Sequence, residues 1–367
     1  MKNPIWWIAL LLAPILFFSV GCSKKSGAPA ALQKLELEKI TKGNGLPGDH
    51  ITALAVFADK VWVGTKTGLA KYDGVNWGIH VKRNTNVLGS DIIEELSIWD
   101  NALWICTDNG VSRFDGTSWS SVAYRGRARS VAARGSEVVI ATAHGVEYSN
   151  SNGQAFQPHG RELGGLVNDE VQELAYDAAG KLWVGTRAGM AVYNAGIFQN
   201  HTGPQQQPMG TSLVEIPASP LSCQLVGNNI KVMMPFQGKL AIGTTSGLNI
   251  TDMAMSWVSY TAPHPEWVQR EGRIMEEKKP GNSPLPGNSI QALAPLPNDQ
   301  GFFVGTNKGL ALFRGGNWVD TGKVLANVPS GQMITALALH NDDLWVGTLY
   351  GLLRVKGISL LFPPPAN

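Results

Sequence analysis

Three histidines share one recurring position, three residues after an aromatic side chain: His80, His159 and His201. Imidazole is a common zinc ligand, but all ligands of one zinc must lie within about 2.0 to 2.3 Å of the ion. Each aromatic residue begins a strand that we expect at the outer edge of a separate sheet, so the three imidazoles would lie far apart. The sequence therefore predicts no metal site, and it holds no motif for another cofactor.

Carboxylates offer a second kind of chemistry. Two of them facing each other across a channel can act as general acid and base, and Glu95 and Glu173 are the candidates. We favour the simpler interpretation, solvated charges at a channel mouth. The sequence contains no Gly-x-Ser-x-Gly elbow, phosphate-binding loop or His-Glu-x-x-His motif, which favours a binding protein over an enzyme. A lyase or hydrolase is the alternative. The six acidic residues in or beside the expected inner strands are Asp91, Glu94, Glu95, Asp169, Glu170 and Glu173.

Recognition residues are expected in a short turn that recurs along the chain as Gly-Thr-x-x-Gly. The two residues between Thr and the second Gly differ in every copy, and variable loops on a fixed scaffold often carry binding residues. Large or charged groups at these positions are the best candidates for contacts. Our candidates are His144, Arg187, Lys308 and Tyr350, followed by Asn109 and Lys66.

The turn belongs to a longer phrase that occurs seven times, as in VWVGTKTGLAKYDGVNW from Val61 and LWVGTRAGMAVYNAGIF from Leu182. The threonines of successive copies are 35 to 62 residues apart. A four-stranded propeller blade typically takes about 40 to 50 residues, and the two longest spacings contain insertions. The threonines are Thr65, Thr107, Thr142, Thr186, Thr244, Thr306 and Thr348.

Each copy contains the pattern of four strands. An apolar run such as ITALAV from Ile51 precedes LWVGT, in which bulky and small residues alternate. The x-x-Gly turn and an Asp-Gly turn are both hairpin signals, and an aromatic residue begins the fourth strand. We predict an all-β fold, a seven-bladed β-propeller of four-stranded antiparallel blades over residues 32–367. The ring can be closed by an outer strand from residues 32–49, which we favour, or by ISLLF at residues 358–362.

The combination of GLPGDHITALAV with VWVGTKTGLAKYDGVNW resembles the two-component regulator propeller repeat family. That resemblance covers residues 32–362 and implies the same propeller fold. Members occur in the periplasmic sensor regions of hybrid histidine kinases and in free-standing exported proteins. It therefore implies an exported, sensor-related protein, but no particular ligand.

The N-terminus has the features of an export signal: Lys2, then an apolar run from Ile5 to Phe18, then small residues. A transmembrane anchor is the alternative, although the run is shorter than the ~20 residues needed to span a bilayer. The sequence SVGC, ending at Cys22, resembles the cleavage site of bacterial lipoproteins. The resemblance implies a signal peptide at 1–21, lipidation of Cys22, a flexible tether at 22–31, and an outer-membrane location because Ser23 follows.

Two further cysteines, Cys106 and Cys223, are expected to be unpaired, with a disulfide between them as the alternative. Two Pro- and Gly-rich insertions, 203–229 and 262–288, are long enough to be functional loops. Trp267 in the second is either a partner anchor or a pin that holds its loop to a blade.

A formal net charge of +2 gives no reason to expect nucleic acid as a partner. The sequence as a whole predicts a lipid-anchored protein of the cell envelope that binds an envelope protein, a glycan or a small molecule. An accessory role to a separately encoded sensor kinase is a further hypothesis.

Overall fold

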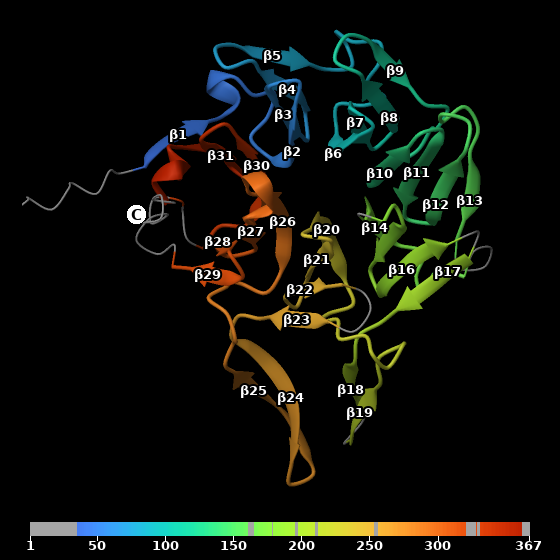
Figure 1. Cartoon of the computed structure of the whole chain (residues 1–367), viewed down its shortest axis with the longest axis vertical. Coiled ribbons are helices and arrows are strands. Elements are labelled where there is room, and N and C mark those ends of the chain that lie inside the picture. The colour runs from blue at the N-terminus through green and yellow to red at the C-terminus, as the bar shows by residue number, and fades with distance from the viewer. Residues whose placement is uncertain are drawn as a thin grey trace, which may run out of the picture. The chain divides into compact units, whose positions relative to one another are not determined.

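The computed structural model describes residues 35–160, 165–177, 179–194, 197–209, 212–252, 256–320, 328 and 331–361. Within them, 32 strands form seven four-stranded antiparallel sheets and two two-stranded hairpins. Three short 3-10 helices, η1 (Lys42–Asn44), η2 (Pro297–Asp299) and η3 (Ile358–Leu361), are the only helical elements described. The sheets follow one another around a common centre (Figure 1). The prediction of a seven-bladed β-propeller is confirmed.

The first four blades each use four consecutive strands. Blade 1 is β2 (Ile51–Phe57), β3 (Lys60–Thr65), β4 (Gly68–Tyr72) and β5 (Trp77–His80). Blade 2 is β6 (Ile93–Trp99), β7 (Ala102–Thr107), β8 (Gly110–Phe114) and β9 (Trp119–Ser121). Blade 3 is β10 (Ser130–Arg134), β11 (Glu137–Thr142), β12 (Gly145–Ser149) and β13 (Gln157–His159). Blade 4 is β14 (Val171–Tyr176), β15 (Leu182–Thr186), β16 (Gly189–Asn194) and β17 (Ile197–His201).

The remaining blades continue the pattern, except that the last is shared between the two ends of the chain. Blade 5 is β20 (Ile230–Phe236), β21 (Lys239–Thr244), β22 (Leu248–Thr251) and β23 (Trp257–Tyr260). Blade 6 is β26 (Ile290–Pro295), β27 (Gly301–Thr306), β28 (Gly309–Arg314) and β29 (Asn317–Val319). Blade 7 is β30 (Ile334–His340), β31 (Asp343–Thr348), β32 (Gly351–Lys356) and β1 (Glu36–Ile40).

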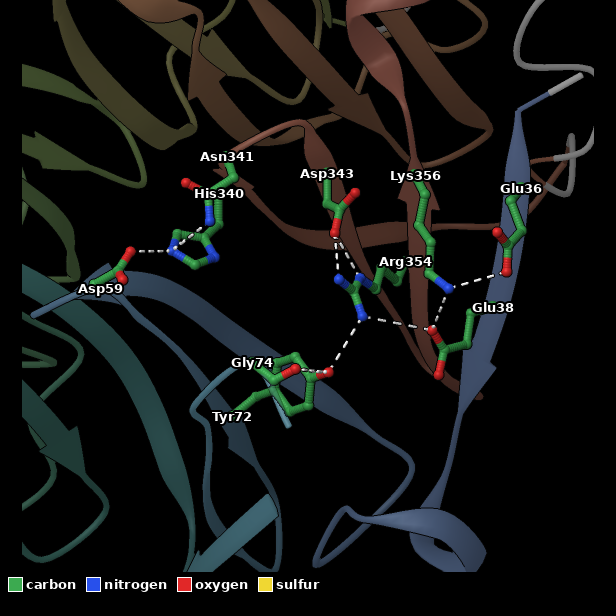
Figure 2. A network of polar contacts seen from close by, with 10 residues as sticks. All are labelled: Glu36, Glu38, Asp59, Tyr72, Gly74, His340, Asn341, Asp343, Arg354 and Lys356. Atoms are coloured by element: carbon green, nitrogen blue, oxygen red, sulfur yellow. Dashed lines mark hydrogen bonds and ion pairs between the residues drawn. The ribbon is translucent and has the colours of Figure 1, made fainter. Parts of the chain in front are cut away.

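The N-terminal strand closes the ring. Strand β1 pairs antiparallel with β32 from Glu36 opposite Lys356 to Ile40 opposite Leu352. The ISLLF segment begins with helix η3 instead of a strand, so the favoured closure is confirmed. Charges reinforce the seam: Lys356 Nζ lies 2.9 Å from Glu36 Oε1, and Arg354 NH1 lies 3.7 Å from Glu38 Oε2 (Figure 2).

Residues of blade 7 also form polar contacts with blade 1. The Arg354 guanidinium donates to the Tyr72 hydroxyl of blade 1 at 3.3 Å, and His340 Nε2 lies 2.9 Å from Asp59 Oδ1 (Figure 2). Blades 7 and 1 are therefore joined by polar contacts as well as by their shared core.

The recurring threonine is explained by two hydrogen bonds that it makes in every blade. Its buried hydroxyl donates to the carbonyl of the glycine three residues later, at 2.8 to 3.0 Å. The same oxygen accepts from the backbone N–H two residues later, at 2.9 to 3.2 Å. A buried hydroxyl satisfied in both directions fixes the turn, so Thr belongs to the framework rather than to recognition.

The glycine before this threonine makes room for the neighbouring blade. A Cβ placed on Gly64 would lie 2.6 Å from Cγ2 of Ile93, and one on Gly347 would lie 2.7 Å from Cγ2 of Ile51. Seven apolar clusters, one between each pair of adjacent blades, form the core. Cys106 replaces this glycine in blade 2, and its cluster contains the small Ala128 of the next blade.

Cys106 and Cys223 are both buried and both free, so the expectation of unpaired thiols is confirmed. Cys106 is fully enclosed, as expected of a small apolar side chain. It has a polar neighbour that the sequence did not indicate, because its thiol lies 3.8 Å from Glu95 Oε2.

Each insertion contains an antiparallel hairpin, β18 (Gln205–Met209) with β19 (Ser212–Ile216) and β24 (His264–Arg270) with β25 (Arg273–Lys279). The backbone N–H of Leu213 donates to Gln269 Oε1 at 3.3 Å, which connects the two hairpins. Trp267 is 40% exposed on β24.

The signal peptide, Cys22 and the tether lie outside the described residues. No helix among the described residues is long and apolar enough to cross a membrane.

Candidate ligand-binding site

One face of the propeller carries both the linkers between blades and the variable turns. In five blades the first variable turn residue donates its backbone N–H to the linker residue that directly precedes the inner strand. Examples are Lys66 to His50 at 3.3 Å and Arg187 to Glu170 at 3.1 Å. We call this the linker face. The variable turns therefore lie directly beside the linkers.

The inner strands present a ring of seven polar residues to the central channel. In six blades the ladder between the first two strands shifts register around one residue near the start of the inner strand. Such a β-bulge turns a side chain out of the regular alternation. Arg129 holds the corresponding place in blade 3. The channel ring is Thr52, Glu94, Arg129, Gln172, Lys231, Gln291 and Thr335, and all seven line a cavity of about 260 Å³.

A second cavity, of about 430 Å³, opens over one part of this ring. It is lined by residues of blades 2 to 5 and their linkers, with four cations and two carboxylates among them. We call it the funnel mouth. Its residues are Glu94, Arg127, Arg129, Glu170, Gln172, Arg187, Asn229 and Lys231.

Three of the cations near the mouth are neutralised by carboxylates. Glu94, whose side chain is 13% exposed, pairs with Lys66 at 3.3 Å and with Arg127 at 3.1 Å. Arg187 pairs with Glu170 at 3.1 Å. These bridges lie at or near the surface, where an ion pair contributes little to stability but holds its side chains in position.

Arg129 and Lys231 form no ion pair with any described residue. The Lys231 ammonium donates to Gln172 Oε1 at 2.8 Å, and the Gln172 amide donates in turn to Asn229 Oδ1 at 2.9 Å. Arg129 reaches only the Val171 carbonyl, at 3.4 Å. Burial, followed by the positive charges of Arg187 and Arg129, lowers the pKa of Lys231. Among the described residues neither cation forms an ion pair with a carboxylate, although the charge of Glu170 partly opposes the lowering of the Lys231 pKa.

Below the ring, the carboxyl groups of Glu95 and Glu173 both line the channel cavity. Burial raises the pKa of Glu95 to about 7, against hydrogen bonds from Ser130, Val131 and Cys106 that favour the charged form. Burial and then the charge of Glu95 raise the pKa of Glu173 well above its ordinary value, although the Met233 backbone opposes this. Two carboxyl groups so placed do not both ionise readily at neutral pH.

The candidate turn residues divide according to their place in the turn. Lys66 and Arg187 hold its first position, and their side chains extend to Glu94 and Glu170. Asn109 and Lys308 hold the second, and each lies against the glycine of a linker, Gly89 or Gly287.

The other two candidates also lie away from the funnel mouth. His144 and Tyr350 hold second positions and are exposed, Tyr350 by 65%. Asn109 lines a separate cavity of about 300 Å³ with Lys82 and Arg125. Of the six candidates, Arg187 lines the funnel mouth, Lys66 lies beside it in an ion pair with Glu94, and the other four do not line it.

The recurring histidines pack against aromatic rings of their own blades. His80 stacks on Trp62 with centroids 5.9 Å apart, His159 meets Tyr148 at 5.9 Å, and His201 meets Trp183 at 5.7 Å. Burial lowers the pKa of His80 and His201. The described part of the chain contains no cluster of three or more metal-ligating side chains.

Sequence reasoning missed Arg129, Gln172, Asn229 and Lys231, which form the centre of the site. A signal was present, because a polar residue interrupts the start of each inner-strand run, as in IEEL, VQEL and IKVM. That interruption falls at the bulge in six blades, and the interrupting residue is charged or amide-bearing in blades 2 to 6.

No protein-family profile matches the chain, and no curated protein matches it. Among solved structures, the chain is similar to the extracellular domain of a putative one component system of B. thetaiotaomicron, with a TM-score of 0.58 and 18% identity. That match covers 87% of this chain and 40% of the other, so this chain spans two fifths of that domain's length.

Two other structures are similar over nearly their whole length. YCF48 bound to D1 peptide has a TM-score of 0.54 and 16% identity, over 90% of this chain and 97% of that one. Virginiamycin B lyase from Staphylococcus aureus has a TM-score of 0.55 and 8% identity, over 88% and 99%. At these identities the likeness establishes the propeller fold.

Proposed function

We propose that this protein is a ligand-binding module of the cell envelope and that its ligand occupies the funnel mouth. The observation that carries the proposal is the position of Arg129 and Lys231, which form no ion pair with any described residue, inside a cavity of about 430 Å³. Small-molecule sites are typically concave, about 300 to 1,000 Å³, with a few convergent polar groups. A ligand with an anionic group would pair with these two cations through charge-assisted hydrogen bonds.

Thermal-shift screening of the full-length protein against anionic, neutral and cationic small molecules tests this proposal. Anionic ligands should raise the melting temperature of the wild type, because a ligand that binds only the folded state stabilises it. The double variant Arg129→Met with Lys231→Met should lose that rise. Lys239→Met, on the exposed end of β21 away from the mouth, is the matched control and should keep it. A hit whose effect survives the double variant would place the site elsewhere.

An envelope location is the second part of the proposal. It is supported by the apolar leader, the lipoprotein-like Cys22, and the similarity in fold to an extracellular domain. We infer export, lipidation at Cys22 and an outer-membrane location, with a sensor-related role for the propeller. Labelling cells with a radioactive fatty acid should mark the wild type and leave Cys22→Ser unlabelled. A labelled Cys22→Ser variant, or an unlabelled wild type, would contradict the anchor.

The Glu95 and Glu173 pair supports a second candidate function, an enzyme of the lyase or hydrolase type. One protonated and one ionised carboxyl group could serve as acid and base. Any turnover found with the wild type should then fall in Glu95→Gln and Glu173→Gln. Turnover that these variants leave unchanged would eliminate the pair as catalytic residues.

A further inference from the structure

The cationic and acidic groups of the channel lie in two adjacent layers. Arg129 and Lys231 belong to the channel ring, whereas Glu95 and Glu173 each follow a ring residue by one position on the same strand. Consecutive strand residues are separated by roughly 3.3 Å along the strand. The inner strands start at the linker face, so the carboxyl groups lie deeper in the channel than the cations.

The two layers also share one continuous set of walls. Glu94, Arg129, Gln172 and Lys231 line both the funnel mouth and the channel cavity, while Glu95 and Glu173 line the channel cavity. A small molecule held at Arg129 and Lys231 can therefore extend toward the carboxyl pair.

We propose that the site takes a small zwitterion, an α-amino acid or a compound with the same two charged groups a few ångströms apart. Arg129 and Lys231 receive its carboxylate, and Glu95 and Glu173 receive its ammonium group. This inference rests on the proposed function and specifies its ligand class.

The acidic layer distinguishes a zwitterion from a simple anion. Glu95 accepts from the Val131 backbone N–H at 3.0 Å and from Cys106, and Glu173 has no described cation beside it. An ammonium group between the two carboxylates would allow both to ionise, because an opposite charge nearby favours the charged form. A carboxylate or phosphate without an amine would bind at the mouth and leave the pair unused. Arginine and lysine bind such an anion through charge-assisted hydrogen bonds in either case.

The decisive experiment is isothermal titration calorimetry on the full-length protein with three matched series of probes. The first is the twenty free amino acids with β-alanine and γ-aminobutyrate. The second is their N-acetyl derivatives, which keep the carboxylate and lose the ammonium charge. The third is their amides, which keep the ammonium and lose the carboxylate. We expect at least one free amino acid to bind, and we expect its N-acetyl and amide derivatives each to bind at least about thirty-fold more weakly.

The variants assign each charge to its layer. Glu173→Gln should weaken binding of the free amino acid at least about ten-fold and leave the affinity for the N-acetyl derivative unchanged. Lys231→Met should weaken both. Glu276→Gln, at an exposed position on β25, is the matched control and should weaken neither. Circular dichroism melts show whether each variant is folded. Glu95→Gln should have the same effect as Glu173→Gln, since both carboxyl groups are proposed to receive the ammonium group.

The possible failures can be told apart. If the N-acetyl derivative binds as tightly as the free amino acid, or Glu173→Gln and Glu95→Gln both leave amino-acid affinity unchanged, the ligand is a simple anion. The zwitterion proposal is then wrong, although the funnel remains the binding site. If no probe binds, the zwitterion proposal is also wrong. The proposed function itself fails only if screening hits survive replacement of Arg129 and Lys231.

Discussion

The two halves of the channel ring share one framework and differ in charge. Blades 2 to 5 contribute Glu94, Arg129, Gln172 and Lys231, whereas blades 6, 7 and 1 contribute Gln291, Thr335 and Thr52. The same bulge turns these side chains into the channel on both sides, except in blade 3, where the ladder has no register shift. The difference shows that the repeat fixes where a side chain points and leaves its chemistry free. We assign recognition to the charged half, composed of blades 2 to 5, and call the other the neutral half.

One interface of the charged half is packed differently from most others. Gly305 and Gly347 of the neutral half, like Gly185 and Gly243 of the charged half, each face an isoleucine of the next blade. In the charged half, Cys106 replaces the glycine of blade 2 and Ala128 lies in the same cluster. Most interfaces therefore pair a glycine with an isoleucine. Where the glycine is replaced by the larger Cys106, the facing residue is the smaller Ala128, so the combined side-chain volume is roughly kept. Blade 3, which supplies Arg129, is the blade that departs furthest from the repeat.

Exchanging one residue in each half gives the largest expected effect. Lys231→Gln should weaken ligand binding at least about thirty-fold, because it removes a charge that contacts the ligand. Gln291 holds the same ring position in the neutral half, and its amide donates to Ser289 Oγ at 2.7 Å. The Gln291→Leu variant should change ligand affinity less than about two-fold. Calorimetric titration measures both. Equal losses would mean that the ligand does not distinguish the halves.

Repacking the blade 2 and blade 3 interface tests the difference in packing. Ala128→Ile alone should lower the free energy of unfolding by about 1 to 3 kcal/mol, since it adds three carbons to a filled core. Cys106→Gly combined with Ala128→Ile recreates the pair found between other blades and should recover part of the loss. Thermal and denaturant unfolding give the values. A double variant less stable than Ala128→Ile alone would show that the two sites do not compensate.

The carboxyl pair predicts how stability responds to pH. The folded-state pKa of Glu95, about 7, lies above its value of 4.5 in the unfolded chain. The folded protein therefore binds more protons between those values, and the free energy of unfolding should fall as pH rises through this window. Glu95→Gln should be stabilised relative to the wild type at pH 8, by on the order of 1 to 3 kcal/mol.

The groups facing the pair set the comparison for that measurement. The charged side chains that line the same cavity are Glu94, Arg129 and Lys231. The direct neighbours are the Cys106 thiol, whose own pKa burial raises, the Ser130 hydroxyl and the Val131 and Met233 backbones. The control Glu276→Gln should keep the wild-type slope between pH 4.5 and 7. If the unfolding free energy of Glu95→Gln changes with pH as steeply as that of the wild type and of Glu276→Gln, the Glu95 carboxyl is ionised throughout this range.

The smallest expected effect concerns the rim of the charged half. Arg187 is 63% exposed in its side chain and already paired with Glu170. Arg187→Ala should therefore weaken binding by no more than about five-fold, roughly 1 kcal/mol. Lys308→Ala, at the second turn position of the neutral half, should have no effect. Titrations at low and at high salt measure both. A loss for Arg187→Ala as large as that for Lys231→Gln would move the centre of the site outward.

The fold was predictable because its information is local and repeated. The Thr hydroxyl bonds, the glycine turns and the alternation in LWVGT all lie within one short phrase, so seven copies reinforce one interpretation. The closure by β1 followed from the need to pair an edge. The binding site was only half predictable. Lys66 and Arg187 lie in the variable turns that we selected, but Lys231 reaches the channel through a bulge, and Arg129 directly precedes the inner strand of blade 3.

Strict alternation along a strand assigns a residue at a bulge to the wrong face of the sheet. The hairpins in the two insertions were also missed, since QQQPM and HPEWVQR lack the regular apolar pattern of a half-buried strand. The pairing of Glu95 with Glu173 depends on two blades that are not adjacent in the ring, so its raised pKa values could be inferred only from coordinates.

A crystal structure of the protein with its tightest-binding amino acid tests the central claim most directly. We predict density in the funnel mouth, with the ligand carboxylate within hydrogen-bond distance of Arg129 and Lys231 and the amine directed toward Glu95 and Glu173. A ligand bound only against the neutral half of the ring, or in the separate cavity lined by Asn109, would contradict the assignment of recognition to blades 2 to 5.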